Sequence, residues 1–151
     1  MKQVIAIGCD HGGYKIKEAV KKFFTENEDM VVLDEYEIID HGCYNEDSVD
    51  YPDIAHALCD DVESGKALLG ILVCGSGNGI NMAANSHKGV RSALCWRPDV
   101  AALAIQHNNA NVMALPGRFI TESDAIECVS KFIYSRFEGG RHEKRVNKIK
   151  Q

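Results

Sequence analysis

Cys74 and the glycine-rich turn after it are the residues of this chain best suited to chemistry. Residues 68–85 read LLGILVCGSGNGINMAAN: an apolar run of strand composition, a turn of Gly, Ser and Asn, and then a helical composition. Strand, glycine turn and helix in succession direct several backbone N–H groups and a helix N-terminus at one point, which attracts developing negative charge. Such a field also favours the thiolate of a nearby cysteine. We therefore expect Cys74 to act as a base beside an oxyanion site.

The turn matches neither of two common nucleotide-binding signatures. A dinucleotide fingerprint, G-x-G-x-x-G, needs a third glycine where this chain has Ile80, and the turn lies in mid-chain rather than in the first βα unit. A P-loop needs Gly-Lys-Ser/Thr, which does not follow the glycines. The alternative is a tight turn with a buried structural cysteine, which the motif alone leaves open.

A single domain spanning 1–151 is expected, because 151 residues suffice for one sizeable core but not for two. The chain enters a strand-like segment directly after Met1, and no apolar run approaches membrane length, so neither a secretory leader nor a membrane partner is expected. The six cysteines are irregularly spaced and form no C-x-x-C pair. That pattern predicts reduced thiols, no metal site and a cytoplasmic location.

The C-terminal segment differs in charge from the rest of the chain. Residues 136–151 contain six Lys or Arg against two Glu, whereas the whole chain has a net charge of −5. A solvated basic helix face is the usual explanation of such a run. The run is too short, and the chain too acidic, for a nucleic-acid partner. A small anionic ligand remains open.

Predicted strands and helices alternate along the whole chain. Strands are predicted at 4–8, within 30–40, and at 68–73, 91–95 and 112–115; helices follow each of them, and a basic helix begins near Arg141 beyond Gly139-Gly140. This order predicts an α/β fold, a Rossmann-like three-layer αβα sandwich with a five-stranded parallel sheet. Residues 137–151 form a basic C-terminal extension of it.

Polar residues follow the predicted strands, at the edge where ligands bind in such sheets. They are Asp10 and His11 after the first strand, His41 to Tyr44 after the second, the Cys74 turn after the third, 106–111 after the fourth strand and its helix, and Arg118 after the fifth. We expect all of them at one edge. Each has an alternative: Asp10 as a helix cap, His11 and His107 as structural histidines, Arg118 as a surface charge.

Six segments carry a family resemblance. They are GCDHGGYKIKE (8–18), SVDYPD (48–53), CGSGNG with AAN (74–85), QHNNAN (106–111), GR (117–118) and EGGRHEKRV (138–146). In these segments, which run in order over nearly the whole chain, the protein resembles the ribose-5-phosphate isomerase B and galactose-6-phosphate isomerase family. The resemblance implies an aldose–ketose isomerase for ribose 5-phosphate and ribulose 5-phosphate, with no metal and no organic cofactor.

The resemblance also implies residue roles. Isomerisation through a cis-enediolate needs a base, an oxyanion site and a group that opens the sugar ring. Cys74 would be the base, and His107, with Ser76 and Asp10 nearby, would open the ring. The implied substrate-binding residues are Gly75, Gly77, Asn78 and Gly79 at the enediolate, Tyr44 and Asn108 at the sugar, and His11, Arg118, Arg141 and Arg145 at the phosphate. In the family the last two arginines come from a neighbouring subunit, which implies a homodimer or a dimer of dimers with shared sites.

The sequence departs from the family pattern at three positions. Ile80 stands where relatives that lack the cysteine carry a glutamate, Ser76 replaces a commoner threonine, and Cys43 replaces a threonine beside Tyr44. The segment 25–36 is also longer than the family pattern. Two other functions remain open: a hexose-6-phosphate isomerase of the allose- or galactose-6-phosphate type, and a non-catalytic sugar-phosphate-binding protein. A pure binder needs neither Cys74 nor His107, which favours the enzyme.

Overall fold

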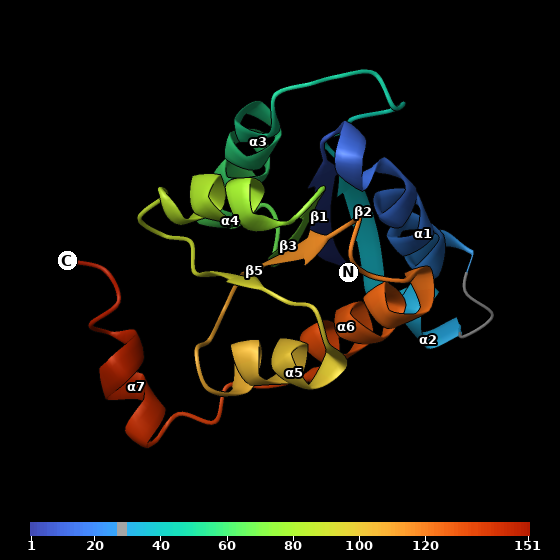
Figure 1. Cartoon of the computed structure of the whole chain (residues 1–151). Helices are drawn as coiled ribbons and strands as arrows, with labels where there is room; N and C mark the ends of the chain where they lie inside the picture. The colour runs from blue at the N-terminus through green and yellow to red at the C-terminus, as the bar shows by residue number, and fades with distance from the viewer. Residues whose placement is uncertain (27–29) are drawn as a thin grey trace.

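A five-stranded parallel sheet forms the centre of the computed structural model, which describes residues 1–26 and 30–151 (Figure 1). The strands are β1 (Gln3–Cys9), β2 (Tyr36–Asp40), β3 (Leu69–Cys74), β4 (Ser92–Leu94) and β5 (Val112–Pro116), in the order β2-β1-β3-β5-β4. The register sets Cys9 opposite Val73 and Cys74 opposite Pro116. The ends of the three central strands therefore lie at one edge, as predicted.

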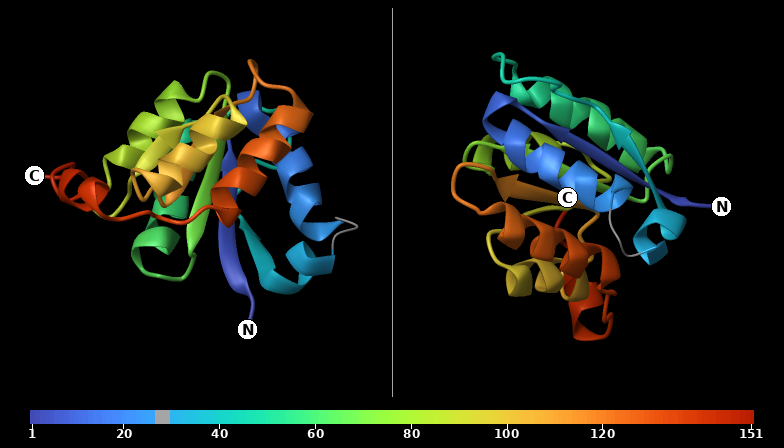
Figure 2. Two further views of the ribbon diagram at one scale, coloured as in Figure 1. Left: turned by 90° about the horizontal axis from the view of Figure 1, so that it is seen from below. Right: turned by 90° about the vertical axis from the view of Figure 1, so that its right-hand side faces the viewer.

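Helices cover both faces of the sheet (Figures 1 and 2). They are α1 (Tyr14–Thr25), α2 (Met30–Glu35), α3 (Tyr51–Glu63), α4 (Asn78–Asn85), α5 (Pro98–Gln106), α6 (Glu122–Tyr134) and α7 (Arg141–Val146), with a 3-10 helix at His11–Gly13. One face packs against α1, α5 and α6, and the other against α3 and α4. The predicted three-layer αβα sandwich is confirmed.

The alternation of side chains along β3 explains why this strand is apolar throughout. Ile71 and Val73 belong to the core beneath α1, α5 and α6, whereas Leu72 and Cys74 belong to the core beneath α3 and α4. A parallel strand covered on both faces buries every side chain. The continuous apolar run at 68–73 is the sequence signature of that position.

The region 30–40 divides into two elements. Its strand is β2, and the residues before it form the short helix α2. The expectation of a long segment at 25–36 falls partly on 27–29, which lie outside the described residues. In the part of the chain that the structure describes, no helix combines the length and the apolar character that crossing a membrane would require.

The basic extension leaves the sandwich after α6, and α7 stands apart from the three layers (Figure 1). Two hydrogen bonds tie it to its own chain. The Glu138 N–H donates to the Gln106 carbonyl oxygen at 3.0 Å, and Lys150 Nζ donates to the Asn85 carbonyl oxygen at 2.8 Å. Docking of this extension on a partner subunit stays a prediction.

Candidate active site

Three main-chain segments meet at the carboxyl end of β3, so closely that Gly13 and Gly117 have no room for a Cβ atom. A Cβ atom on Gly13 would lie 2.4 Å from the carbonyl oxygen of Val73, and one on Gly117 would lie 2.8 Å from that of Gly12. A Cβ atom on Gly12 would in turn lie 3.0 Å from the amide nitrogen of Gly75. We call Gly12, Gly13, Gly75 and Gly117 the glycine floor. At this edge the ends of the central strands therefore pack main chain against main chain.

Cys74 ends β3 at the side of this floor, and the predicted turn and helix follow it. Its side chain is buried, with 5% of the residue exposed. Gly77 has a left-handed φ of +79°, and a Cβ there would lie 2.5 Å from a Leu94 methyl, so only glycine fits before α4 begins. Ser76 is exposed, and its Oγ accepts a hydrogen bond from the Asn78 N–H at 3.2 Å. The strand–turn–helix prediction is confirmed.

Asp10 and His11 follow β1 at the same edge. Asp10 Oδ1 accepts hydrogen bonds from the N–H groups of Gly12 at 2.9 Å and Gly13 at 3.2 Å, so this carboxylate does cap a helix. The cap uses Oδ1, and Oδ2 takes no part in it. His11 Nδ1 accepts the Val49 N–H at 3.3 Å, so the neutral ring carries its proton on Nε2 as a donor. Among residues 1–26 and 30–151, these structural bonds leave Asp10 Oδ2 and His11 Nε2 without a hydrogen-bond partner.

Arg118 lies against the glycine floor. Its backbone N–H donates to the Gly75 carbonyl oxygen at 2.9 Å, which places the side chain above the turn. A Cβ on Gly75 would lie 3.2 Å from Arg118 Nη1. The residue is nevertheless exposed, so its guanidinium is available to an anion.

A fully buried lysine, Lys17, binds the end of β2 and the loop after it, which carries Tyr44. Lys17 Nζ donates to both carboxylate oxygens of Asp40, at 3.0 and 2.9 Å, and to the Cys43 carbonyl oxygen at 2.7 Å. Burial opposes the charge of Lys17, but hydrogen bonds to Asp40 and Glu18 outweigh it and raise the lysine pKa. Burial also opposes the charge of Asp40 and alone would raise its pKa, but the hydrogen bonds from lysine outweigh burial and lower that pKa. The Tyr44 hydroxyl donates to the Asp40 carbonyl oxygen at 2.8 Å, leaving its ring exposed.

Sequence reasoning missed Lys17, because lysine is rarely buried. A signal was available. Lys17 follows Ile16 and precedes Val20 by three positions, which places it on the apolar face of α1. A lysine on such a face needs a buried acid as its partner, and Asp40 at the end of β2 supplies it.

His107 and Asn108 lie at the opposite edge of the sheet from Cys74. Helix α5 links β4 to β5 and runs antiparallel to them, so His107 at its end lies near the start of β5. Asn111 confirms this position, because its carbonyl oxygen accepts a hydrogen bond from Gly70 near the start of β3. The prediction that 106–111 share the Cys74 edge is therefore wrong within one chain. It treated residues after a helix as if they followed a strand.

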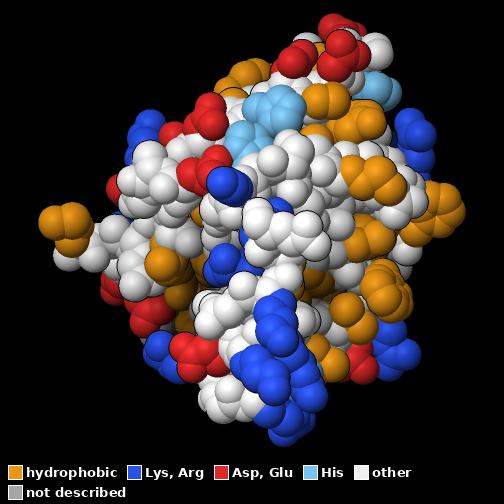
Figure 3. Space-filling model, turned by 90° about the vertical axis from the view of Figure 1, so that its left-hand side faces the viewer, with side chains coloured by type: hydrophobic (Ala, Val, Ile, Leu, Met, Phe, Trp, Pro, Cys, Tyr) orange, Lys and Arg blue, Asp and Glu red, His pale blue; other side chains and the backbone are white. Residues whose placement is uncertain are grey.

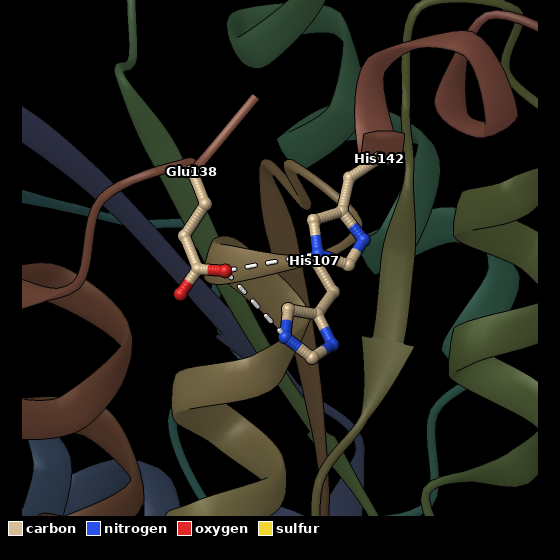
Figure 4. Close-up of side chains that lie close together, drawn as sticks. All are labelled: His107, Glu138 and His142. Carbon is tan, nitrogen blue, oxygen red and sulfur yellow. Dashed lines mark ion pairs between the residues drawn. The ribbon is translucent and has the colours of Figure 1, made fainter. Parts of the chain in front are cut away.

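The arginines of the extension lie with His107, not with Cys74. Glu138 and His142 surround the His107 ring (Figure 4), and Arg141 and Arg145 are exposed on the same short helix, α7. Figure 3 shows a cluster of Lys and Arg side chains where α7 lies, with hydrophobic side chains exposed beside it. The predicted site residues thus form two groups, one at each edge of the sheet.

The cavity at the far edge is a separate feature. It measures about 790 Å³ and is lined by the beginnings of three strands, at Gln3, Tyr36 and Leu69, and by Asn109 and Asn111. None of the residues around the glycine floor lines it. The candidate active site is instead the surface above the floor, because that is where Cys74, His11 and Arg118 gather.

Fold and site define a Rossmann-like α/β protein with a cysteine beside a floor of glycine main chain at the carboxyl edge of its sheet. The family model described as Ribose/Galactose Isomerase matches residues 5–149. The chain belongs to the ribose/galactose isomerase family, which confirms the resemblance read from the six segments.

Individual relatives agree with this assignment over almost their full length. Ribose-5-phosphate isomerase B of Escherichia coli is 37% identical over 145 residues, covering 96% of this chain and 93% of that protein. The crystal structure of a ribose 5-phosphate isomerase from Thermotoga maritima has a TM-score of 0.91 at 44% identity, covering 99% of this chain and 98% of the other. Ribose-5-phosphate isomerase B from Mycoplasma genitalium, solved with bound ribulose-5-phosphate, has a TM-score of 0.86 at 42% identity, covering 99% and 95%.

Proposed function

We propose that this chain is an aldose–ketose isomerase that interconverts D-ribose 5-phosphate and D-ribulose 5-phosphate. The observation that carries the proposal is Cys74 beside a glycine floor, in a chain 42% identical to an isomerase solved with ribulose-5-phosphate. The reaction moves one proton between neighbouring carbons. It therefore needs a base and a site for negative charge, and no redox partner.

The proton transfer would use the Cys74 edge. The Cys74 thiolate removes the proton from C2 of the open aldose and returns it to C1, and a cis-enediolate forms in between. Backbone N–H groups of residues 75–79 hold the enediolate oxygens, which carry the charge that develops. The turn supports the assignment, because Gly77 has a left-handed φ of +79° and α4 begins directly after it at Asn78.

The phosphate would be held by donors from both edges. The Nε2–H of His11 and the guanidinium of Arg118 lie on the Cys74 side of the molecule. Arg141 and Arg145 add two more guanidinium groups, whose planar forks suit phosphate oxygens. Tyr44 would line the sugar, since its ring is 67% exposed.

A complete site requires two chains in this proposal. His107 and Asn108 would open the ring and bind the sugar in the site of a partner subunit, together with Arg141 and Arg145. Their position at the far edge supports this arrangement, because one chain does not bring them to Cys74. Three large apolar side chains, Met82, Trp96 and Leu103, are 72%, 54% and 41% exposed and offer a contact surface. The assembly is a homodimer, alone or paired into a dimer of dimers.

The protein would work in the cytoplasm. Its six cysteines are all free thiols, and Cys9 and Cys43 lie with their sulfur atoms only 3.7 Å apart. Free thiols in such proximity are typical of a reducing compartment.

A hexose-6-phosphate isomerase is the second candidate, because the matching family model is described by galactose as well as ribose. A coupled assay of the purified protein, with ribose 5-phosphate compared against allose 6-phosphate and galactose 6-phosphate, decides between them. We expect the largest kcat/KM on ribose 5-phosphate, and its loss after treatment with a thiol alkylator. Preference for a hexose phosphate would favour the second candidate. Absence of turnover on all three would contradict both and favour a non-catalytic binder.

A further inference from the structure

The cluster of His107, Glu138 and His142 contains a buried nitrogen without a hydrogen bond. Across residues 1–26 and 30–151, His142 Nε2 is the buried side-chain nitrogen or oxygen that lacks a hydrogen-bond partner. Its side chain is 9% exposed. Glu138 Oε1 lies 3.7 Å from this atom and also 3.7 Å from His107 Nε2 (Figure 4). Buried polar atoms are almost always paired, so this arrangement requires an explanation.

A metal site is a poor explanation, although two imidazoles and a carboxylate are common ligands. Zinc binds an imidazole nitrogen at about 2.0–2.1 Å, along the lone pair in the ring plane. The His107 and His142 rings are stacked, with centroids 4.1 Å apart and planes inclined by 13°. Their lone pairs therefore run side by side and do not converge on one ion.

The stacked rings accommodate only one positive charge. Two cations at this spacing repel each other, and the guanidinium groups of Arg141 and Arg145 add to the repulsion. Burial, followed by the charges of His107 and Arg141, lowers the pKa of His142, against the opposing effect of Glu138. The side chain of His107 is 37% exposed, so its charge is better solvated. His142 is therefore the neutral ring of the pair.

We propose that Glu138 and His142 are positioning residues for His107, holding its imidazole by stacking and by a carboxylate placed equally close to both rings. The inference rests on the proposed role of His107 in ring opening. In that step the C1–O4 bond breaks and its electron pair stays on O4, which takes the proton that His107 donates. The C1 hydroxyl becomes the aldehyde by releasing its proton to a base, for which Asp10 is the candidate. Glu138 Oε1, 3.7 Å from His107 Nε2, would hold the ring in place for this proton transfer.

Kinetics of Glu138→Gln test the positioning role. Glu143→Gln is the matched control, since Glu143 is an exposed acid in the first turn of α7 and outside the cluster. We expect Glu138→Gln to lower kcat on ribose 5-phosphate about tenfold with KM unchanged. Glu143→Gln should retain the wild-type kcat and KM. Equal effects of the two substitutions would overturn the proposal, because a general charge effect would explain them.

Histidine NMR gives a readout that needs no activity. The ring nitrogens of His142 are identified by their loss in His142→Gln and followed through a pH titration. The midpoint should rise by about half a pH unit or more in His107→Asn, where the facing cation is absent, and fall in Glu138→Gln. An unmoved midpoint in both variants overturns the proposal, whatever the activity. If the wild-type protein is inactive but the His142 midpoint shifts as expected in both variants, the interaction within the cluster is supported and the proposed isomerase function is contradicted.

Discussion

At the residue scale, Cys74 and His107 divide the proposed chemistry between proton transfer and ring opening. Cys74 is buried at the end of β3, whereas His107 is half-exposed at the end of α5. The two side chains belong to different edges of the sheet, so substitutions at them should produce different kinetic defects.

Replacing Cys74 by alanine should lower kcat/KM on ribose 5-phosphate by about 10³-fold or more, because it removes the only base of the proposed transfer. Binding should persist, since the proposed phosphate contacts are those of His11 and the arginines. A coupled assay and titration calorimetry with ribulose 5-phosphate measure the two properties. Cys128→Ala is the control, because this thiol lies on the buried face of α6. Turnover above a few per cent of wild type would exclude Cys74 as the base.

Replacing His107 by asparagine should impair the cyclic substrate selectively. Ribulose 5-phosphate cannot close into a furanose, so it bypasses ring opening. We expect consumption of ribose 5-phosphate to fall by about 10²-fold, while exchange of the carbon-bound hydrogen of ribulose 5-phosphate with solvent deuterium stays near the wild-type rate. Equal losses in both measurements would place His107 in the proton transfer itself. A lowered melting temperature would instead identify a structural histidine.

At the scale of elements, the buried pair of Lys17 and Asp40 joins α1 to the end of β2. The folded state lowers the pKa of Asp40, so the pair stabilises the protein above the unfolded value of about 3.9 and loses this effect as pH falls through the folded value. Below that range the protonated Asp40 resembles asparagine in charge.

Asp40→Asn should therefore destabilise the protein at neutral pH and hardly change its stability in acid. We expect the free energy of unfolding to fall by about 3 kcal/mol at pH 7, because Lys17 keeps a buried charge without its main partner. Urea unfolding at pH 7, 5 and 3 measures the difference, which should shrink at the lowest pH. Glu37→Gln, at an exposed position of β2, should show no such trend. A difference that is constant with pH would contradict this account.

The elements were predictable where local pattern and tertiary environment agree. The buried run of β3 and the glycines after it could be read directly. Helix α2 could not, because the β-branched Val31 and Val32 favour a strand and only context decides otherwise. The location of His107 was mispredicted for a topological reason: a helix reverses the chain, so residues at its end lie at the edge where the next strand begins. The ion pair of Lys17 could not be predicted either, because its partner, Asp40, is distant in sequence.

At the scale of the whole molecule, a site divided between two edges predicts complementation between inactive subunits. Cys74→Ala chains mixed with His107→Asn chains should regain activity, because each mixed dimer contains one site with both residues intact. Random exchange gives one half mixed dimers and roughly a quarter of the wild-type activity. The same holds for Cys74→Ala with Arg141→Ala/Arg145→Ala. Persistent inactivity, with exchange verified by native mass spectrometry, would show that each chain completes its own site.

The glycine floor restricts how this protein can evolve. Most binding surfaces change their preference by exchanging side chains, but at Gly13 and Gly117 any side chain would collide with neighbouring main chain. Substitution at these two positions is therefore excluded. A change of preference toward longer or shorter sugars would require substitutions at other positions, such as Tyr44 and the residues that a second subunit supplies. A lineage built on this floor would keep its chemistry while its substrates diverge.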